Sequence, residues 1–284
     1  MTAPIITLVD GSIYAASVCE HAAWVSARTG APVELLHVLG RREGGAPQDL
    51  SGAIRLGART RLLEELSELD AQRARLSTQQ GRAILEDAAD LARKAGATEV
   101  RTRLLHGDLI ETVAELEGDA RAIVIGKRGA AADFAKGHLG SNLERIARVS
   151  RKPVLVASRA FQPIDRALIA FDGGESAMKA VHHVASSPLY DDLELALITV
   201  GEPGSAARAR SEAAIAVLNG AGRKTNSLFE PGEPETVLPR IIADQGYGLL
   251  VMGAYGHSRI RSMMIGSTTT EMVRSCKVPV ALYR

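Results

Sequence analysis

The second half of this chain repeats the first, and this duplication constrains the fold more than any other feature of the sequence. Residues 140–157 align with residues 266–283 without a gap, at a shift of 126 positions. Because the match extends upstream, we expect two similar domains, at residues 1–160 and 161–284. Three further pairs of segments match in the same order: 120–129 with 247–256, 107–113 with 232–237, and 6–12 with 168–174.

Each half is predicted to alternate short apolar strands with helices. The apolar runs are rich in Val, Ile and Leu, which is typical of strands buried on both faces of a parallel sheet. Strand–helix alternation favours right-handed βαβ units, so the expected fold is α/β, with two tandem doubly wound sheets. The expected strands are 5–9, 33–38, 99–105, 121–126 and 153–157 in the first half, and 166–171, 193–200, 225–229, 248–252 and 278–283 in the second.

The last helix of each half is predicted to pack one face on its sheet. Apolar and small residues recur there at i, i+3, i+4 and i+7. Cys276 falls on this face, so we expect an inert core thiol, and we expect the same of Cys19. The predicted face residues are Leu143, Ile146, Ala147 and Ser150 in the first half, and Thr269, Met272, Val273 and Cys276 in the second.

The first half carries an insertion, at about residues 41–75. Asp10 precedes Gly126 by 116 residues, whereas the matching Asp172 precedes Gly253 by 81. The insertion begins as a Gly/Pro-rich loop and continues as a charged helix with an apolar stripe. Two roles are open for this helix, which could cover its own domain or contact a partner. The stripe consists of Leu62, Leu63, Leu66 and Leu69.

Composition excludes several classes of protein. Hydrophobic residues make up 46% and charged residues 24%, as in a globular chain. With 34 basic and 33 acidic residues the net charge is +1, which gives no electrostatic footprint for nucleic acid or an anionic membrane. The first ten residues lack a signal-peptide pattern, and no apolar stretch approaches the ~20 residues of a membrane span. The chain has two cysteines, which suits a reducing compartment. We therefore expect a cytoplasmic protein.

A glycine-rich loop follows the fourth expected strand of the second half. Open α/β sheets bind ligands at the carboxyl ends of their strands, where this loop and Asp172 are expected to lie. Gly253 and Gly256 allow a ligand to approach the backbone closely. Gly266, Ser267 and Thr268 offer amides and hydroxyls at a helix N-terminus, which attracts phosphate. Arg259 and Arg261 add positive charge.

The loop spacing resembles the ATP-binding motif of the universal stress protein family: Gly, two residues, Gly, nine residues, Gly-Ser. The resemblance covers essentially the whole chain as two copies. It implies Rossmann-like five-stranded parallel sheets of order 3-2-1-4-5, and either a homodimer or an intramolecular pseudo-dimer. It also implies a stress-response or regulatory protein that binds ATP or ADP, with or without Mg, and hydrolyses ATP at most very slowly. The sequence itself shows no catalytic motif and no metal-ligand spacing.

The resemblance further implies which residues of the second half bind the nucleotide. Asp172 and Val200 would lie near the adenosine, and the glycine loop with Ser267 would hold the phosphates. The implied set is Asp172, Val200, Gly253, Gly256, His257, Arg259, Gly266, Ser267 and Thr268.

The first half departs from this motif. Ten residues separate Gly129 from Gly140, and Asp133 and Phe134 stand where small or basic residues are preferred. Lys127, Arg128 and Lys136 partly offset the acidic residue, and Asn142 replaces the hydroxyl of Thr268. Two interpretations of the first half are therefore open: it could bind a nucleotide, or it could carry a degenerate site kept as a scaffold. The candidate residues are Asp10, Val38, Gly126, Gly129, Gly140 and Ser141.

Two other classes of function compete with nucleotide binding. A nucleotide-free scaffold or interaction protein would use the tandem fold and the inserted helix for oligomerisation. An enzyme of the related adenine-nucleotide-processing superfamily is disfavoured, because the first strand leads into residues 10–14 without a His-x-Gly-His motif.

Overall fold

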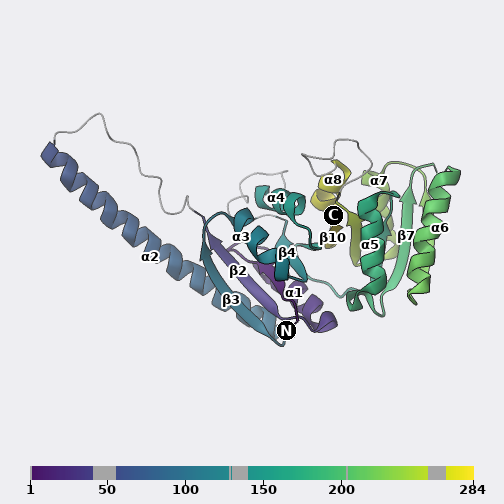
Figure 1. The fold of residues 1–284 in the computed structure, drawn as a ribbon, viewed down its shortest axis with the longest axis horizontal. Coiled ribbons are helices and arrows are strands. Elements are labelled where there is room, and N and C mark those ends of the chain that lie inside the picture. The colour runs from purple at the N-terminus through teal and green to yellow at the C-terminus, as the bar shows by residue number, and fades with distance from the viewer. Residues whose placement is uncertain (1, 41–55, 128, 130–139, 203, 255–266) are drawn as a thin grey trace.

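The computed structural model describes residues 2–40, 56–127, 129, 140–202, 204–254 and 267–284. They form one ten-stranded sheet with helices on both faces (Figure 1). The ten expected strands are confirmed, with ends that differ by at most two residues. The strands are β1 (Ile5–Leu8), β2 (Val33–Leu39), β3 (Val100–His106), β4 (Ala122–Gly126), β5 (Val154–Ala157), β6 (Arg166–Ala170), β7 (Glu194–Val200), β8 (Thr225–Glu230), β9 (Leu249–Gly253) and β10 (Val280–Tyr283).

The strand order explains how the two halves join. It runs β3-β2-β1-β4-β5-β10-β9-β6-β7-β8, so each half has the predicted parallel order 3-2-1-4-5. The last strands of the halves, β5 and β10, pair antiparallel, with Ala281 opposite Leu155. The chain therefore contains an intramolecular pseudo-dimer, one of the two arrangements that the resemblance implied.

Two apolar clusters, one on each face of the sheet, run through both halves. Neighbouring residues of a strand alternate between them, as Ile5 and Ile6 do, because successive side chains point to opposite faces. Four helices cover the first face: α1 (Ala15–Thr29), α2 (Leu56–Lys94), α5 (Glu175–Ser186) and α6 (Ser205–Gly220). Four cover the second: α3 (Leu109–Leu116), α4 (Ser141–Val149), α7 (Pro234–Gln245) and α8 (Ser267–Ser275).

The predicted faces of the two last helices, α4 and α8, are confirmed. All eight predicted residues are buried, including Ser150 and Thr269 among the polar ones. Cys276 and Cys19 are buried free thiols, and burial raises the pKa of Cys19 to about 12. A thiol held protonated in this way is a poor nucleophile.

Helix α2 has two parts with different surroundings. At 39 residues it is about 58 Å long. From Gly81 onward it packs on α1, β2 and β3, and it buries Leu85 and Ala92. Its N-terminal part extends beyond the sheet (Figure 1), and Leu63 and Leu69 are each 49% exposed. The alternative in which the leucine stripe covers its own domain is therefore wrong for these two residues; residues 41–55 of the insertion lie outside the described residues.

Candidate functional site

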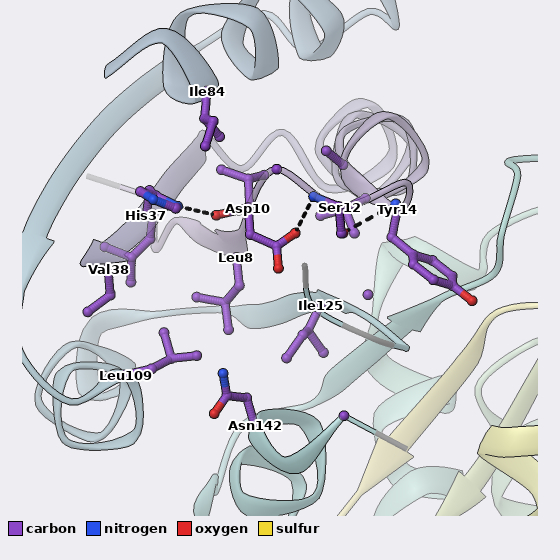
Figure 2. A pocket seen from close by; sticks show the side chains of 18 of the residues that line it. Leu8, Asp10, Ser12, Tyr14, His37, Val38, Ile84, Leu109, Ile125 and Asn142 are labelled. Carbon is purple, nitrogen blue, oxygen red and sulfur yellow. Dashed lines mark hydrogen bonds between the residues drawn. The ribbon is translucent and has the colours of Figure 1, made fainter. Parts of the chain in front are cut away.

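A cavity of about 610 Å³ lies in the first half, at the carboxyl ends of β1, β2 and β4. Strand β1 lies between β2 and β4, so this is where the strand order reverses. Open α/β sheets bind ligands at that point, and the volume is typical of small-molecule sites. The cavity walls come from the strand ends, from α2 and from the start of α4 (Figure 2).

Asp10 follows β1 and lies in the cavity wall (Figure 2). Its Oδ1 accepts a hydrogen bond from the Ser12 backbone N–H at 3.0 Å. Gly129 approaches the other oxygen, because a Cβ atom on this glycine would lie 2.8 Å from Oδ2. The structure therefore brings together Asp10 and Gly129, two of the predicted site residues that are 119 positions apart in the sequence.

The start of α4 forms the wall opposite Asp10 (Figure 2). Gly140 is the N-cap residue and offers no capping side chain, so the first N–H groups of the helix need other partners. Ser141 and Asn142 line the cavity on this side. The positive end of a helix dipole here suits an anionic group such as phosphate.

Several lining residues were missed from the sequence. His37 Nδ1 lies 2.8 Å from the Val9 carbonyl oxygen, and Tyr14 and Ile84 add aromatic and aliphatic surface. Gly81 lets α2 lie close to the sheet, because a Cβ there would lie 2.8 Å from Leu104 Cδ1. A glycine inside a helical pattern was the one available sign of this close approach.

Lys127 is buried against the other half of the chain. The sequence named this lysine as one of three cations that partly offset Asp133, and in the structure it is only 8% exposed. Its Nζ donates a hydrogen bond to the Cys276 carbonyl oxygen, just beyond α8 of the other half. Burial lowers the pKa of this lysine. Four other residues named in the sequence of that loop lie outside the described residues: Arg128, Asp133, Phe134 and Lys136.

In the second half, Asp172 repeats the local turn of Asp10. Its Oδ1 accepts a hydrogen bond from the Gly174 backbone N–H at 2.8 Å, again two residues further on. Val200 ends β7 and is half-buried, as its counterpart Val38 is in β2. Gly256, His257, Arg259 and Gly266 lie outside the described residues, and Ser267 begins α8.

Two second-half residues have structural partners that the sequence did not indicate. A Cβ on Gly253 would lie 2.8 Å from the Ala177 backbone nitrogen, so α5 itself requires this glycine. Thr268 Oγ1 donates a hydrogen bond to Glu235 Oε1 at 2.9 Å, which ties the start of α8 to α7. Both residues therefore serve packing, whether or not they contact a ligand.

The described residues contain neither a metal-binding cluster nor a membrane-spanning helix. In this part of the chain, no group of three or more His, Cys, Asp or Glu side chains could hold a metal ion. Within the same ranges, no helix is long and apolar enough to cross a membrane.

A match to a protein-family model shows which family this chain belongs to. The model of the universal stress protein family matches residues 1–158 and 190–284. The chain belongs to the universal stress protein family. A relative along its full length is universal stress protein Slr1230 of Synechocystis sp., which is 37% identical over 284 residues, 99% of each chain.

Solved structures of the family share this tandem fold. A universal stress protein from Archaeoglobus fulgidus DSM 4304 superposes with a TM-score of 0.69 at 20% identity and covers 99% of this chain and 96% of its own. A putative universal stress protein from Pseudomonas aeruginosa UCBPP-PA14 gives a TM-score of 0.64 at 15% identity, with coverages of 99% and 93%. At these identities the likeness shows the fold alone.

Proposed function

We propose that this universal stress protein binds an adenine nucleotide, ATP or ADP, and acts in regulation rather than catalysis. The observation that carries the proposal is the 610 Å³ cavity, with Asp10 on one side and the uncapped start of α4 on the other. The carboxylate of Asp10 can accept hydrogen bonds from a ribose hydroxyl or the adenine amino group. Backbone N–H groups at Ser141 and Asn142 can hold phosphate.

The apolar part of the cavity suits the adenine ring. Leu8 and Ile125 come from the strand ends, and Ile84 comes from α2. Small-molecule sites typically combine such apolar walls with a few polar groups that fix orientation. The apolar residues of the cavity thus offer a region for a base, and the start of α4 offers a region for phosphates.

We propose a second nucleotide site in the second half, in a domain spanning residues 161–284 that parallels a first domain at residues 1–160. Its support is the complete loop spacing from Gly253 to Ser267 and the turn that Asp172 shares with Asp10. Nucleotide binding there would order residues 253–268 and change a surface that a partner contacts. Mg²⁺ would accompany ATP as a counterion, and the cytoplasm would supply both.

Calorimetric titration of ATP into nucleotide-stripped protein tests the proposal. Val38→Trp and Val200→Trp form a matched pair, because both residues are half-buried at equivalent strand ends. We expect two sites in the wild type and the loss of one site in each variant. Leu63→Trp serves as the control, since this side chain is 49% exposed on α2. A wild type that binds no ATP or ADP would overturn the proposal.

The projecting part of α2 favours a second candidate function, a nucleotide-free interaction protein. Nothing in nucleotide binding requires a helix that extends so far beyond the sheet (Figure 1). Self-association of a wild type that binds no adenine nucleotide would favour this function over the first.

A further inference from the structure

The N-terminal part of α2 presents leucines to solvent at a seven-residue spacing. Leu62, Leu69 and Leu76 follow this spacing, and Leu66 lies on the same side of the helix. Leu69 is 49% exposed and Leu76 is 64% exposed. Together with Leu63, they are three of the five large apolar side chains that remain exposed in the described part of the chain. Apolar residues at this repeat are typical of a helix that pairs with another helix.

Charges along the same segment are distributed unevenly. Within residues 62–80, the part before residue 71 is acidic, with Glu64, Glu65, Glu68 and Asp70, and the part after it is basic, with Arg73 and Arg75. Two copies side by side in parallel would place like charges together. Two antiparallel copies would place the acidic part of each beside the basic part of the other, which is favourable.

We propose that this segment, residues 62–80, pairs antiparallel with the same segment of a second copy of the chain. The pair is centred near residue 71, so Leu66 lies opposite Leu76 of the partner subunit. Arg73 lies near Asp70 of the partner subunit. Within one chain these two residues are 3.9 Å apart and at least 46% exposed, so their charges are accessible to a second helix.

The position of the segment leaves room for a second copy. Residues 62–76 precede the part of α2 that lines the cavity and packs on the sheet, and Figure 1 shows the N-terminal part of α2 extending away from the body of the protein. A segment of the same chain, residues 41–55, is the competing occupant. It offers Leu50 and Ile54 as large apolar residues, and it lacks the matching block of charges.

Sedimentation velocity of the full chain over a range of concentrations tests the pairing. We expect a monomer–dimer equilibrium in the wild type. The double variant Leu69→Glu, Leu76→Glu places carboxylates in the pair and should raise the dissociation constant by roughly tenfold or more. Ala71→Glu is the matched control, because this exposed residue lies on the opposite side of α2 and should leave the constant unchanged.

A charge-reversal experiment separates a second copy from every other occupant. One variant carries Glu64→Lys, Glu65→Lys and Glu68→Lys, and the other carries Arg73→Glu and Arg75→Glu. Each should fail to self-associate, and an equimolar mixture of the two should form heterodimers. A wild type that stays monomeric at about 100 μM, or variants that do not recombine, would overturn the proposal. Circular dichroism checks folding, and ATP binding should be the same in all variants because none of the substituted residues lines the cavity.

Discussion

Lys127, in the loop after β4, donates a hydrogen bond from its buried ammonium group to the backbone carbonyl of Cys276, just beyond α8. The opposite contact also exists, because Arg284 Nη1 donates to the Val149 carbonyl oxygen at the end of α4, at 3.2 Å. A positive charge near a helix C-terminus is favourable, since it complements the helix dipole. Each half therefore stabilises the last helix of the other half.

Replacing Lys127 by methionine should destabilise the protein. The change keeps the length of the side chain but leaves the Cys276 carbonyl oxygen without this donor. We expect the free energy of unfolding to fall by about 1–3 kcal/mol, measured by urea denaturation. Lys152→Met is the control, because Lys152 donates to the Gly118 carbonyl oxygen at an exposed site and should cost below about 0.5 kcal/mol. Equal effects of the two variants would contradict this account.

The hydroxyl groups of Tyr190 and Tyr283 form a buried pair, with their oxygens 2.6 Å apart. Either Tyr→Phe variant should lower the free energy of unfolding by about 1–3 kcal/mol, because the remaining hydroxyl loses this partner. The double variant removes both polar groups and should cost less than the sum of the single changes. Thermal or urea unfolding of the wild type, the two single variants and the double variant gives the coupling energy between the two hydroxyl groups. Strictly additive losses of stability would show that the hydroxyl groups are not coupled.

His21 should make stability depend on pH. Burial lowers the pKa of this histidine from its ordinary value of 6.5 to about 4, although its Nδ1 lies 2.6 Å from the Ser17 carbonyl oxygen. Between these values the unfolded chain binds a proton that the folded chain does not, so stability is lost as pH falls from about 6.5 to about 4.

The variant His21→Phe isolates this contribution. Over that pH range, the wild type should lose up to roughly 3 kcal/mol of stability more than the variant. Urea unfolding at several pH values measures the difference, and parallel pH profiles would show that His21 does not titrate in this way. His183, whose pKa burial also lowers, is present in both proteins and therefore cancels in the comparison.

Gly253→Ala should be destabilising even without any ligand. The new Cβ would lie 2.8 Å from the Ala177 backbone nitrogen and 2.4 Å from Ser176 Oγ, so α5 must shift. We expect the free energy of unfolding to fall by about 1–3 kcal/mol. Gly220→Ala is the matched control, because its Cβ would meet no atom within 4 Å at the end of α6, and it should be neutral or slightly stabilising. An unaffected Gly253→Ala protein would mean that α5 does not require the glycine.

Periodic features of the sequence predicted most of the fold. The buried faces of α4 and α8 followed from the spacing of apolar residues, and all ten strands followed from short apolar runs rich in Val, Ile and Leu. The extent of α2 was not predicted, because the inserted helix continues without a break into the helix that precedes β3, and nothing in the sequence marks this continuity. The repeat aligned β5 with β10, but nothing in either strand indicates that the two pair with each other.

All six residues predicted for the first half line the cavity, because strand ends and the start of the helix after the glycine loop meet there. Asp10 and Gly129 were found because strand ends and glycine spacing are local features. Ile84 and His37 were missed, because their place in the wall depends on how α2 packs. The partner of Lys127 was not predicted, since its neighbours in the sequence are loop glycines, whereas its hydrogen bond crosses to the other half.

The antiparallel contact between β5 and β10 has a consequence for how such a protein can evolve. In an assembly of two identical chains, every substitution changes both subunits at once. Here the two members of the pair are encoded separately, so one can change while the other is preserved. The chain already shows such divergence, because Ala254 occupies the position in the second half that Lys127 occupies in the first. Fusion into one polypeptide thus allows two loops of different sequence to persist in a fixed one-to-one ratio.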